Sequence, residues 1–234
     1  MPTQTRLDDD AQIYHPKAKQ TEKEKLREMS FKGKISYLCE YYKFHAIAIV
    51  AGIAFLIYIV HMLLNPRPTT QFYAAIIDNP ISENVLNEYE DNFMKQLQLN
   101  PKRESIEFNT NFMFGTDDSY AMNVKQALAT YVAAKEVDVI IAPESVFHDY
   151  AYYGYFSKLS DQLPTDIYSS MTDKFYITDT EDDKDKSDYG VYLTDTKLFK
   201  GITNNSEPYV LGILANSPHE ATTIKFIRYL FHEK

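Results

Sequence analysis

Residues 46–64 read AIAIVAGIAFLIYIVHMLL, nineteen residues without a formal charge or a proline. At the α-helical rise of ~1.5 Å per residue, this run is roughly 28 Å long, about the thickness of the hydrocarbon core of a bilayer. A helix in a soluble domain is usually apolar along one face, whereas this run is apolar all round. The run therefore predicts a transmembrane helix that divides the chain into an N-terminal segment and a C-terminal domain.

Two other interpretations of the apolar run are open. A cleaved signal peptide lies within about the first 30 residues and ends in small residues. Here 45 residues precede the run, and Asn65 and Pro66 follow it. The single cysteine, Cys39, lies before the run and cannot serve as a lipoprotein acceptor after it. We therefore interpret the run as an uncleaved signal anchor, with a buried hairpin helix of a soluble protein as the alternative.

The flanking charges predict the orientation of this anchor. Residues 1–45 contain nine lysines and arginines, whereas the twenty residues after Leu64 contain only Arg67. Basic residues accumulate on the cytoplasmic side of a membrane. We expect a single-pass protein of the cell membrane, with a cytoplasmic N-terminus and an extracytoplasmic C-terminal domain.

The charge balance changes at the same place in the chain. Residues 1–45 carry nine basic and seven acidic side chains, and residues 46–234 carry 15 and 26, a net charge of −11 for that part. Such an acidic domain argues against nucleic acid as a partner. With no cysteine after the run, the domain has no disulfide, which fits a bacterial envelope. Residues 1–45 form a basic tail that we expect to be partly disordered, because residues 1–20 are polar and lack periodicity.

The rest of the chain predicts one α/β domain. Residues 65–71 contain Pro66 and Pro68 and form a short, stiff linker. Within residues 72–234, apolar strands alternate with amphipathic helices, which predicts a mostly parallel, doubly wound sheet of about five strands. The predicted strands are 72–78, 105–114, 137–143, 189–193 and 209–216. The predicted helices are 79–99, 117–136, 145–153 and 217–231.

The strand patterns also predict an order. Residues 72–78 (FYAAIID) and 137–143 (VDVIIAP) are largely apolar without interruption, as is typical of central strands, whereas 105–114 alternates, as an edge strand does. This favours the order 2-1-3, with ligands binding at the carboxyl ends of these strands. The residues of this predicted rim are Asp78, Asn79, Asp117, Asp118, Glu144 and Ser145. The simplest role for Asp117 and Asp118 is to cap a helix, and the alternative is to bind a cation or an amine.

Two segments resemble the first lobe of bacterial type 2 extracellular (periplasmic) solute-binding proteins. Residues 125–164 resemble the family's helix, "D-V-apolar" strand, short helix and "G-x-F-x-x-L-x-x-x-L" turn. The residues that fit this turn are Gly154, Phe156, Leu159 and Leu163. Residues 209–231 resemble the returning strand and helix of the family. The matching residues there are Gly212, Asn216, Ser217, Ala221, Phe226 and Leu230.

The layout of the whole chain resembles a group of uncharacterised single-span membrane proteins of Firmicutes that carry such a domain. Members of the solute-binding family clamp a ligand between two lobes. Only residues 165–188 remain here for a second lobe, and their TDTEDDKDKSD stretch is typical of a solvated loop. The resemblance therefore implies one lobe without its opposing lobe.

The sequence contains none of the common motifs for a zinc protease, a redox dithiol, a nucleophilic serine or a phosphate loop. We therefore expect no enzymatic activity, cofactor or metal. The acidic residues between Asp179 and Asp188 lack the glycine and final glutamate of a calcium-binding loop, so a solvated loop is the preferred interpretation.

A cluster of tyrosines is the strongest candidate for a contact surface: Tyr150, Tyr152, Tyr153 and Tyr155. These side chains either pack under the following loop or form a surface for a sugar or a protein. We expect a membrane-tethered, non-enzymatic interaction domain that contacts the lipid bilayer and an envelope protein. The alternative is a membrane-anchored receptor that binds a small solute, of unknown identity, at the rim.

Overall fold

The computed structural model describes residue 21, residues 23–24, residue 27 and residues 29–65, 68–115, 118–204 and 207–232. The chain forms two compact units, which join between Asn65 and Pro66. Residues 1–20 of the expected cytoplasmic tail lie outside the described residues, and so does Asp117 of the expected rim.

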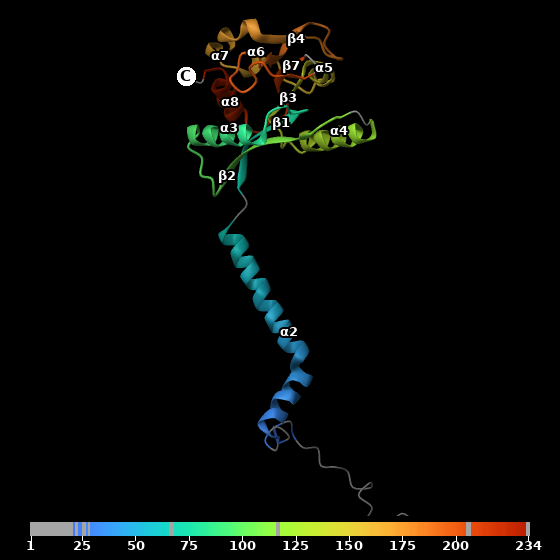
Figure 1. The fold of residues 1–234 in the computed structure, drawn as a ribbon, viewed down its shortest axis with the longest axis vertical. Coiled ribbons are helices and arrows are strands. Elements are labelled where there is room, and N and C mark those ends of the chain that lie inside the picture. The colour runs from blue at the N-terminus through green and yellow to red at the C-terminus, as the bar shows by residue number, and fades with distance from the viewer. Residues whose placement is uncertain are drawn as a thin grey trace, which may run out of the picture. The chain divides into compact units, whose positions relative to one another are not determined.

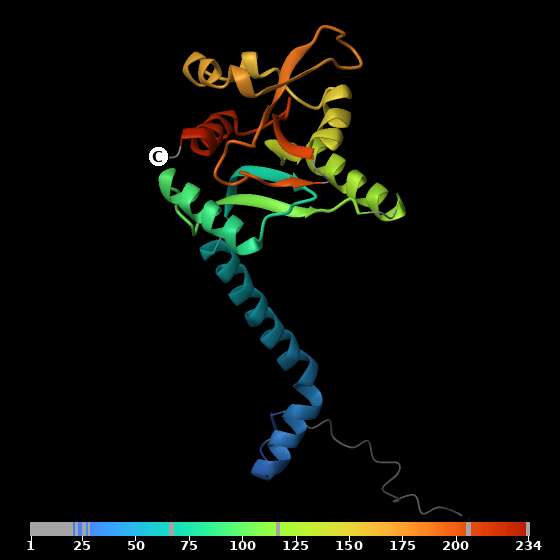
Figure 2. The ribbon, with the colours of Figure 1, turned by 45° about the horizontal axis from the view of Figure 1, so that its top comes forward.

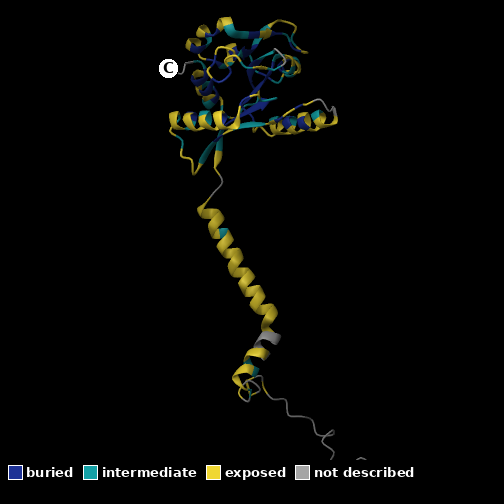
Figure 3. Ribbon diagram, viewed as in Figure 1, coloured by how far each residue is buried: buried dark blue, intermediate teal, exposed yellow. Residues whose placement is uncertain are grey.

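The first unit contains one long helix, α2 (Phe31–Leu64), which includes the whole apolar run. Ser30 caps its start, because the Ser30 hydroxyl accepts a hydrogen bond from the Gly33 N–H at 3.3 Å. Its stretch Tyr42–Leu64 has a mean hydropathy of 2.6, and Figure 3 shows it as almost entirely exposed. The helix is long and apolar enough to cross a membrane. The predicted apolar helix is therefore confirmed, and its insertion in a bilayer stays a prediction.

The second unit is built on a seven-stranded sheet with the order β2-β1-β3-β7-β5-β4, in which β6 pairs with β7 (Figure 1). The strands are β1 (Thr69–Ile77), β2 (Glu104–Phe112), β3 (Val139–Pro143), β4 (Phe175–Thr178), β5 (Ser187–Tyr192), β6 (Thr203–Asn204) and β7 (Glu207–Ile213). β1 is parallel to both β2 and β3. The predicted α/β class and the predicted order 2-1-3 are confirmed.

Beyond β3 the sheet continues in antiparallel pairs, which the sequence did not predict. β7 is antiparallel to both β3 and β5, and β4 is antiparallel to β5. No helix separates β4 from β5 or β5 from β7, so the chain reverses by turns rather than by a crossover. The expected doubly wound sheet is therefore parallel through β3 and antiparallel after it, with β4 and β6 as two further short strands.

Helices cover both faces of the sheet, and Figure 2 shows α3 and α8 on one side and α4 and α5 on the other. The helices of this unit are α3 (Glu83–Gln96), α4 (Asp118–Ala133), α5 (Glu144–Tyr152), α6 (Leu159–Gln162), α7 (Thr165–Ser170), the 3-10 turn η1 (Thr172–Lys174) and α8 (Glu220–His232). Residues 72–77 are all buried, because alternate side chains of β1 enter two separate cores. This double burial explains the continuous apolar run of β1.

The core on the α3 and α8 side is aromatic. The ring of Phe72 in β1 lies with its centroid 4.5 Å from that of Phe226 in α8 and 6.0 Å from that of Phe93 in α3. All three side chains are buried. These contacts hold α3 and α8 against the middle of the sheet by burial of apolar area.

A buried carboxylate fixes the start of α8. Asp138 directly precedes β3 and has no exposed surface. Its Oδ1 accepts hydrogen bonds from the Ser217 hydroxyl at 2.6 Å and the His219 N–H at 3.0 Å, and its Oδ2 from the Tyr73 N–H at 2.9 Å. The sequence predicted a helix over residues 217–231. Instead, Ser217 binds Asp138 and the helix begins at Glu220.

Residues 165–188 do not form a second lobe. They contribute α7, η1, β4 and the start of β5 to the same compact unit (Figure 1). β4 extends the sheet at its edge by pairing with β5. The described C-terminal unit is therefore built on one central sheet.

We predict that residues 66–234, produced without α2, fold alone and that Asp138→Ala destabilises them. The substitution leaves the Tyr73 and His219 N–H groups and the Ser217 hydroxyl without their acceptor, a loss of roughly 3–5 kcal/mol in the free energy of unfolding. Urea denaturation followed by circular dichroism measures this loss. Ser217→Ala removes only one donor and should cost about 1 kcal/mol. Equal stability of the Asp138→Ala and wild-type domains would contradict the proposed role of this carboxylate.

Candidate functional site

Side chains of the predicted rim, at the carboxyl ends of β1 and β3, form hydrogen bonds within the protein. Asp78 follows β1 in a left-handed backbone conformation, with φ of 48°. Its Oδ1 accepts a hydrogen bond from the Phe114 N–H at 2.7 Å. The hydroxyl of buried Tyr209, from β7, donates to the Asp78 carbonyl, and burial is the main cause that raises the pKa of this phenol. Asp78 therefore joins β1, β2 and β7.

The other rim side chains are also engaged. Asn79 forms a local turn, because its Oδ1 accepts from the Ile81 N–H at 3.1 Å and its Nδ2 donates to the Ile81 carbonyl at 2.8 Å. The Tyr192 hydroxyl donates to Glu144 at 3.1 Å. Burial, with a smaller contribution from Glu144, raises the pKa of Tyr192 to about 12.

Ser145 forms a hydrogen bond at the rim with its backbone N–H. Its N–H donates to the Glu207 carboxylate at 2.9 Å, and hydrogen bonds from Ser145 lower the pKa of Glu207. Asp118 is the first residue of α4. Asp78, Asn79, Glu144 and Ser145 therefore hydrogen-bond to the protein's own strands and turns.

The four candidate tyrosines form two pairs at the end of α5. The rings of Tyr150 and Tyr155 meet edge to face with centroids 5.0 Å apart, and those of Tyr152 and Tyr153 do so at 5.5 Å. Tyr150 is half-buried, and burial raises the pKa of its phenol above the ordinary range. Tyr153 is 66% exposed. The cluster therefore combines both interpretations, with Tyr150 packed inward and Tyr153 facing solvent.

A groove of about 580 Å³ runs between α4 and α5 and contains three of these tyrosines. The residues that line it are Phe114, Met122, Lys125, Gln126, Ala129, Val146, Asp149, Tyr150, Tyr153 and Tyr155. We call it the tyrosine groove. The ring of Phe114 lies beneath the Lys125 ammonium, which is 5.1 Å from the ring centroid. Gly154, with φ of 73°, ends α5 and turns the chain so that Tyr155 returns beside Tyr150.

The tyrosine groove presents apolar side chains to solvent beside a few polar ones. Met122 is 68% exposed and Tyr153 is 66% exposed, on opposite walls. Exposed Tyr and Met beside isolated polar groups are typical of contact surfaces. The groove contains Lys125, Gln126 and Asp149 as hydrogen-bonding groups. Among the described residues, no group of three His, Cys, Asp or Glu side chains could hold a metal ion.

The sequence identified the tyrosine wall of this groove but not the opposite wall. Met122, Lys125 and Gln126 come from α4 and meet α5 only because both helices pack on the same face of the sheet. The helical pattern does indicate that Met122 is exposed, because it lies outside the stripe of Val124 and Leu128 that enters the core. The pattern does not indicate which residues lie beside Met122.

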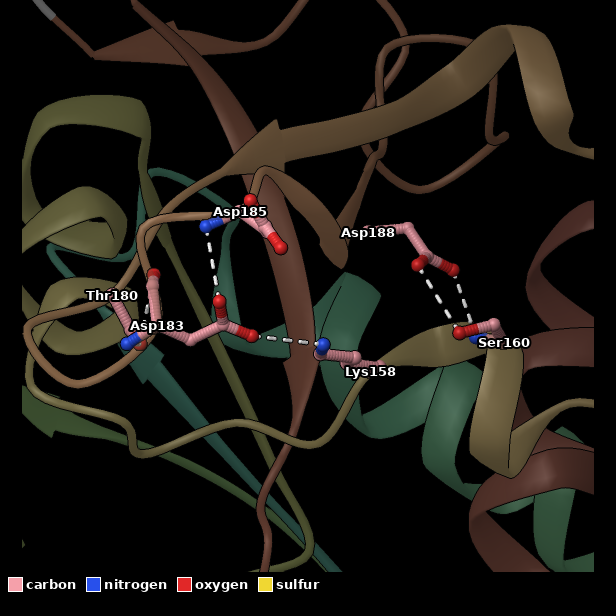
Figure 4. Close-up of polar contacts among 6 residues, drawn as sticks. All are labelled: Lys158, Ser160, Thr180, Asp183, Asp185 and Asp188. Carbon is pink, nitrogen blue, oxygen red and sulfur yellow. Dashed lines mark hydrogen bonds and ion pairs between the residues drawn. The ribbon is translucent and has the colours of Figure 1, made fainter.

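The loop between β4 and β5 forms polar contacts with the segment that follows α5, as Figure 4 shows for Lys158 and Asp183. The Asp183 carboxylate accepts from Lys158 Nζ at 3.1 Å and from the Asp185 N–H at 3.0 Å. The Glu181 N–H donates to the Tyr152 carbonyl at 2.7 Å. In the same view, Asp188 accepts from the Ser160 N–H at 2.7 Å. The expected solvated loop is therefore held in place by specific hydrogen bonds.

No family model matches this chain, and no curated protein matches it. Among solved structures, the chain is similar to the ABC substrate-binding protein Lmo0181 from Listeria monocytogenes, solved in complex with cycloalternan. The identity is 17% and the TM-score is 0.30, over 53% of this chain and 29% of that protein. The matched part thus spans less than a third of that protein's length, and the similarity assigns no ligand to this chain.

We predict that Asp183→Ala loosens the loop between β4 and β5. The hydrogen bond from the Asp185 N–H, followed by Lys158, lowers the pKa of Asp183, so its contribution is present at neutral pH and is lost as the pH falls below about 4. Amide exchange of residues 179–186 should accelerate in the variant at pH 7, while the strands stay protected. Asp182→Ala, at an exposed neighbour, is the matched control. Unchanged exchange in Asp183→Ala would show that the loop is ordered by other contacts.

Proposed function

We propose that this chain is a membrane-tethered, non-enzymatic interaction domain of an envelope or transport complex, and that it contacts a protein partner through the tyrosine groove. The observation that carries the proposal is the exposure of Met122 and Tyr153 on facing walls of this groove. Large apolar side chains exposed together on a folded domain usually mark a binding surface. α2 supports the tether, because Tyr42–Leu64 is long and apolar enough to span a bilayer.

A protein partner fits this groove better than capture of a solute at the rim. Good small-molecule sites bury most of their ligand, which a two-lobed protein achieves by closure. The described C-terminal unit has one sheet, and its rim groups at Asp78, Asn79 and Glu144 are engaged by the protein itself. A partner could supply the missing wall of the tyrosine groove and bury both Tyr153 and Met122.

A membrane-anchored solute receptor is the second candidate, and the size of the groove favours it. A volume of about 580 Å³ lies within the range of small-ligand sites. The receptor would then bind at the tyrosine groove rather than at the rim. Without closure, we expect dissociation constants no better than about 0.1 mM for a monomeric sugar or amino acid.

The orientation is a prediction from the flanking charges. Nine basic residues lie within residues 1–45, so the N-terminus should be cytoplasmic. Protease added to intact cells stripped of their wall should destroy a C-terminal tag and spare an N-terminal tag. A tagged cytoplasmic protein controls for lysis. The opposite pattern would place the tyrosine groove in the cytoplasm and exclude an extracytoplasmic partner.

The partner is tested by photocrosslinking in membranes. A benzophenone amino acid replacing Gln126, in the groove, should capture a discrete protein from native membranes. Met122→Ala combined with Tyr153→Ala should lower the yield about tenfold, because truncation of buried hot-spot residues costs 1–2 kcal/mol or more. Ile177→Ala, at a side chain that is 57% exposed on β4, is the matched control.

Calorimetry of the full-length protein against sugars, amino acids and peptides separates the two candidates. Submicromolar binding of a small solute that depends on Tyr153 would favour the receptor. A crosslinked protein that disappears with the groove variants but persists with Ile177→Ala would support the interaction domain. Equal crosslinking in all variants would contradict the interaction role of this groove.

A further inference from the structure

A second hollow, of about 480 Å³, lies at the amino-terminal ends of β1 and β3, opposite the predicted rim. It is separate from the tyrosine groove and independent of the proposed function. Thr70 of β1 lines it, together with the turn after α4 and the segment before α8. The side chains that determine its chemistry are Tyr73, Glu107, Tyr131, Lys135, Glu136 and His219.

The neutral form of His219 is held in one tautomer. Its Nδ1 lies 3.0 Å from Oδ2 of Asp138, a carboxylate with no exposed surface. A carboxylate only accepts hydrogen bonds, so Nδ1 carries the proton and donates it to Asp138. Nε2 is then a hydrogen-bond acceptor on a side chain that is 27% exposed and lines the hollow.

The carboxylates of Glu107 and Glu136 line the same hollow, and their negative charges repel each other. Burial is the main cause that raises the pKa of Glu107, and the charge of Glu136 adds to it. Burial and the charge of Glu107 raise the pKa of the Tyr73 phenol as well. The ammonium of Lys135 balances only one of the two carboxylates, so the lining is net negative. A cation that entered would relieve this repulsion.

Aromatic rings form one wall of the hollow. The rings of Tyr73 and Tyr131 are stacked, with centroids 6.0 Å apart and an interplanar angle of 30°. Tyr131 is 38% exposed, which leaves ring surface available to a ligand. Ring faces attract ammonium groups and the methylene groups beside them.

We propose that this hollow binds a primary ammonium group, accepted by His219 Nε2 and the carboxylates of Glu107 and Glu136, with its methylene chain against Tyr131. The three acceptors suit the three N–H bonds of an alkylammonium. The group can come from a free diamine or from the lysine side chain of a peptide, which present the same chemistry.

The test uses the full-length protein in detergent, with 1,4-diaminobutane as the probe and butane-1,4-diol as its neutral counterpart. Calorimetry should detect the diamine and not the diol. Glu136→Gln, at an exposed side chain, should weaken diamine binding about tenfold or more, because a charge-assisted hydrogen bond contributes 1.5–3 kcal/mol. Glu107→Gln should act in the same direction. Glu88→Gln, at an exposed side chain of α3, should leave binding unchanged.

A peptide with one internal lysine and blocked termini identifies the source of the ammonium group. Binding of both the peptide and the diamine supports a lysine-bearing partner, and binding of the diamine alone supports a free amine. Equal binding of the diol, or diamine binding that is unchanged in Glu136→Gln and Glu107→Gln, would overturn the proposal. Absence of heat at millimolar diamine would overturn it as well. Thermal unfolding of each variant confirms that it is folded.

Discussion

The buried carboxylate of Asp138, directly before β3, connects β1 and the start of α8. It accepts hydrogen bonds from Tyr73 in β1, from Ser217, and from the backbone and ring of His219 before α8. Among the described residues, Asp138 is the one charged side chain that is fully buried. Removing a carboxylate from water is costly unless its oxygens are satisfied, and the four donors offset that cost. Because the donors come from different segments, the carboxylate is satisfied only when β1, β3 and the start of α8 are in place together.

The sheet topology explains why Asp78 and Ser145, at the carboxyl ends of the parallel strands, bind the protein itself. β7 runs antiparallel to β3 and therefore brings its first residues to the end where a ligand would enter. Tyr209 then reaches Asp78, and Glu207 reaches the N–H of Ser145. In a fully parallel sheet this end carries only outgoing loops, which leave a crevice. Here Asp78 and Ser145 are held by these hydrogen bonds, and exposed apolar side chains lie between α4 and α5.

The sequence predicted the elements that depend on local pattern and missed those that depend on distant partners. Largely apolar runs at 72–78 and 137–143 predicted two central strands, because burial on both faces favours apolar side chains at successive positions. The sequence did not predict β4, because its four residues, between a 3-10 turn and an acidic loop, are too few to show an alternating pattern. The rim was predicted at the strand ends from local pattern, whereas its hydrogen bonds to β7 depend on a strand far along the chain. The sequence placed Asp138 in a strand but did not predict its hydrogen bonds, because its partners lie 65 and about 80 residues away.

An open groove on a tethered domain has a thermodynamic consequence. A domain that cannot close around its ligand forgoes the contacts that closure would add, so its intrinsic affinity is limited. A membrane anchor compensates for this, because a partner confined to the same surface meets the domain at an effective concentration in the millimolar range. Under the proposed function, contacts of modest strength at Tyr153 and Met122 would then be sufficient for occupancy. Release of the tether would weaken binding without altering a contact in the groove, so the anchor would contribute directly to recognition.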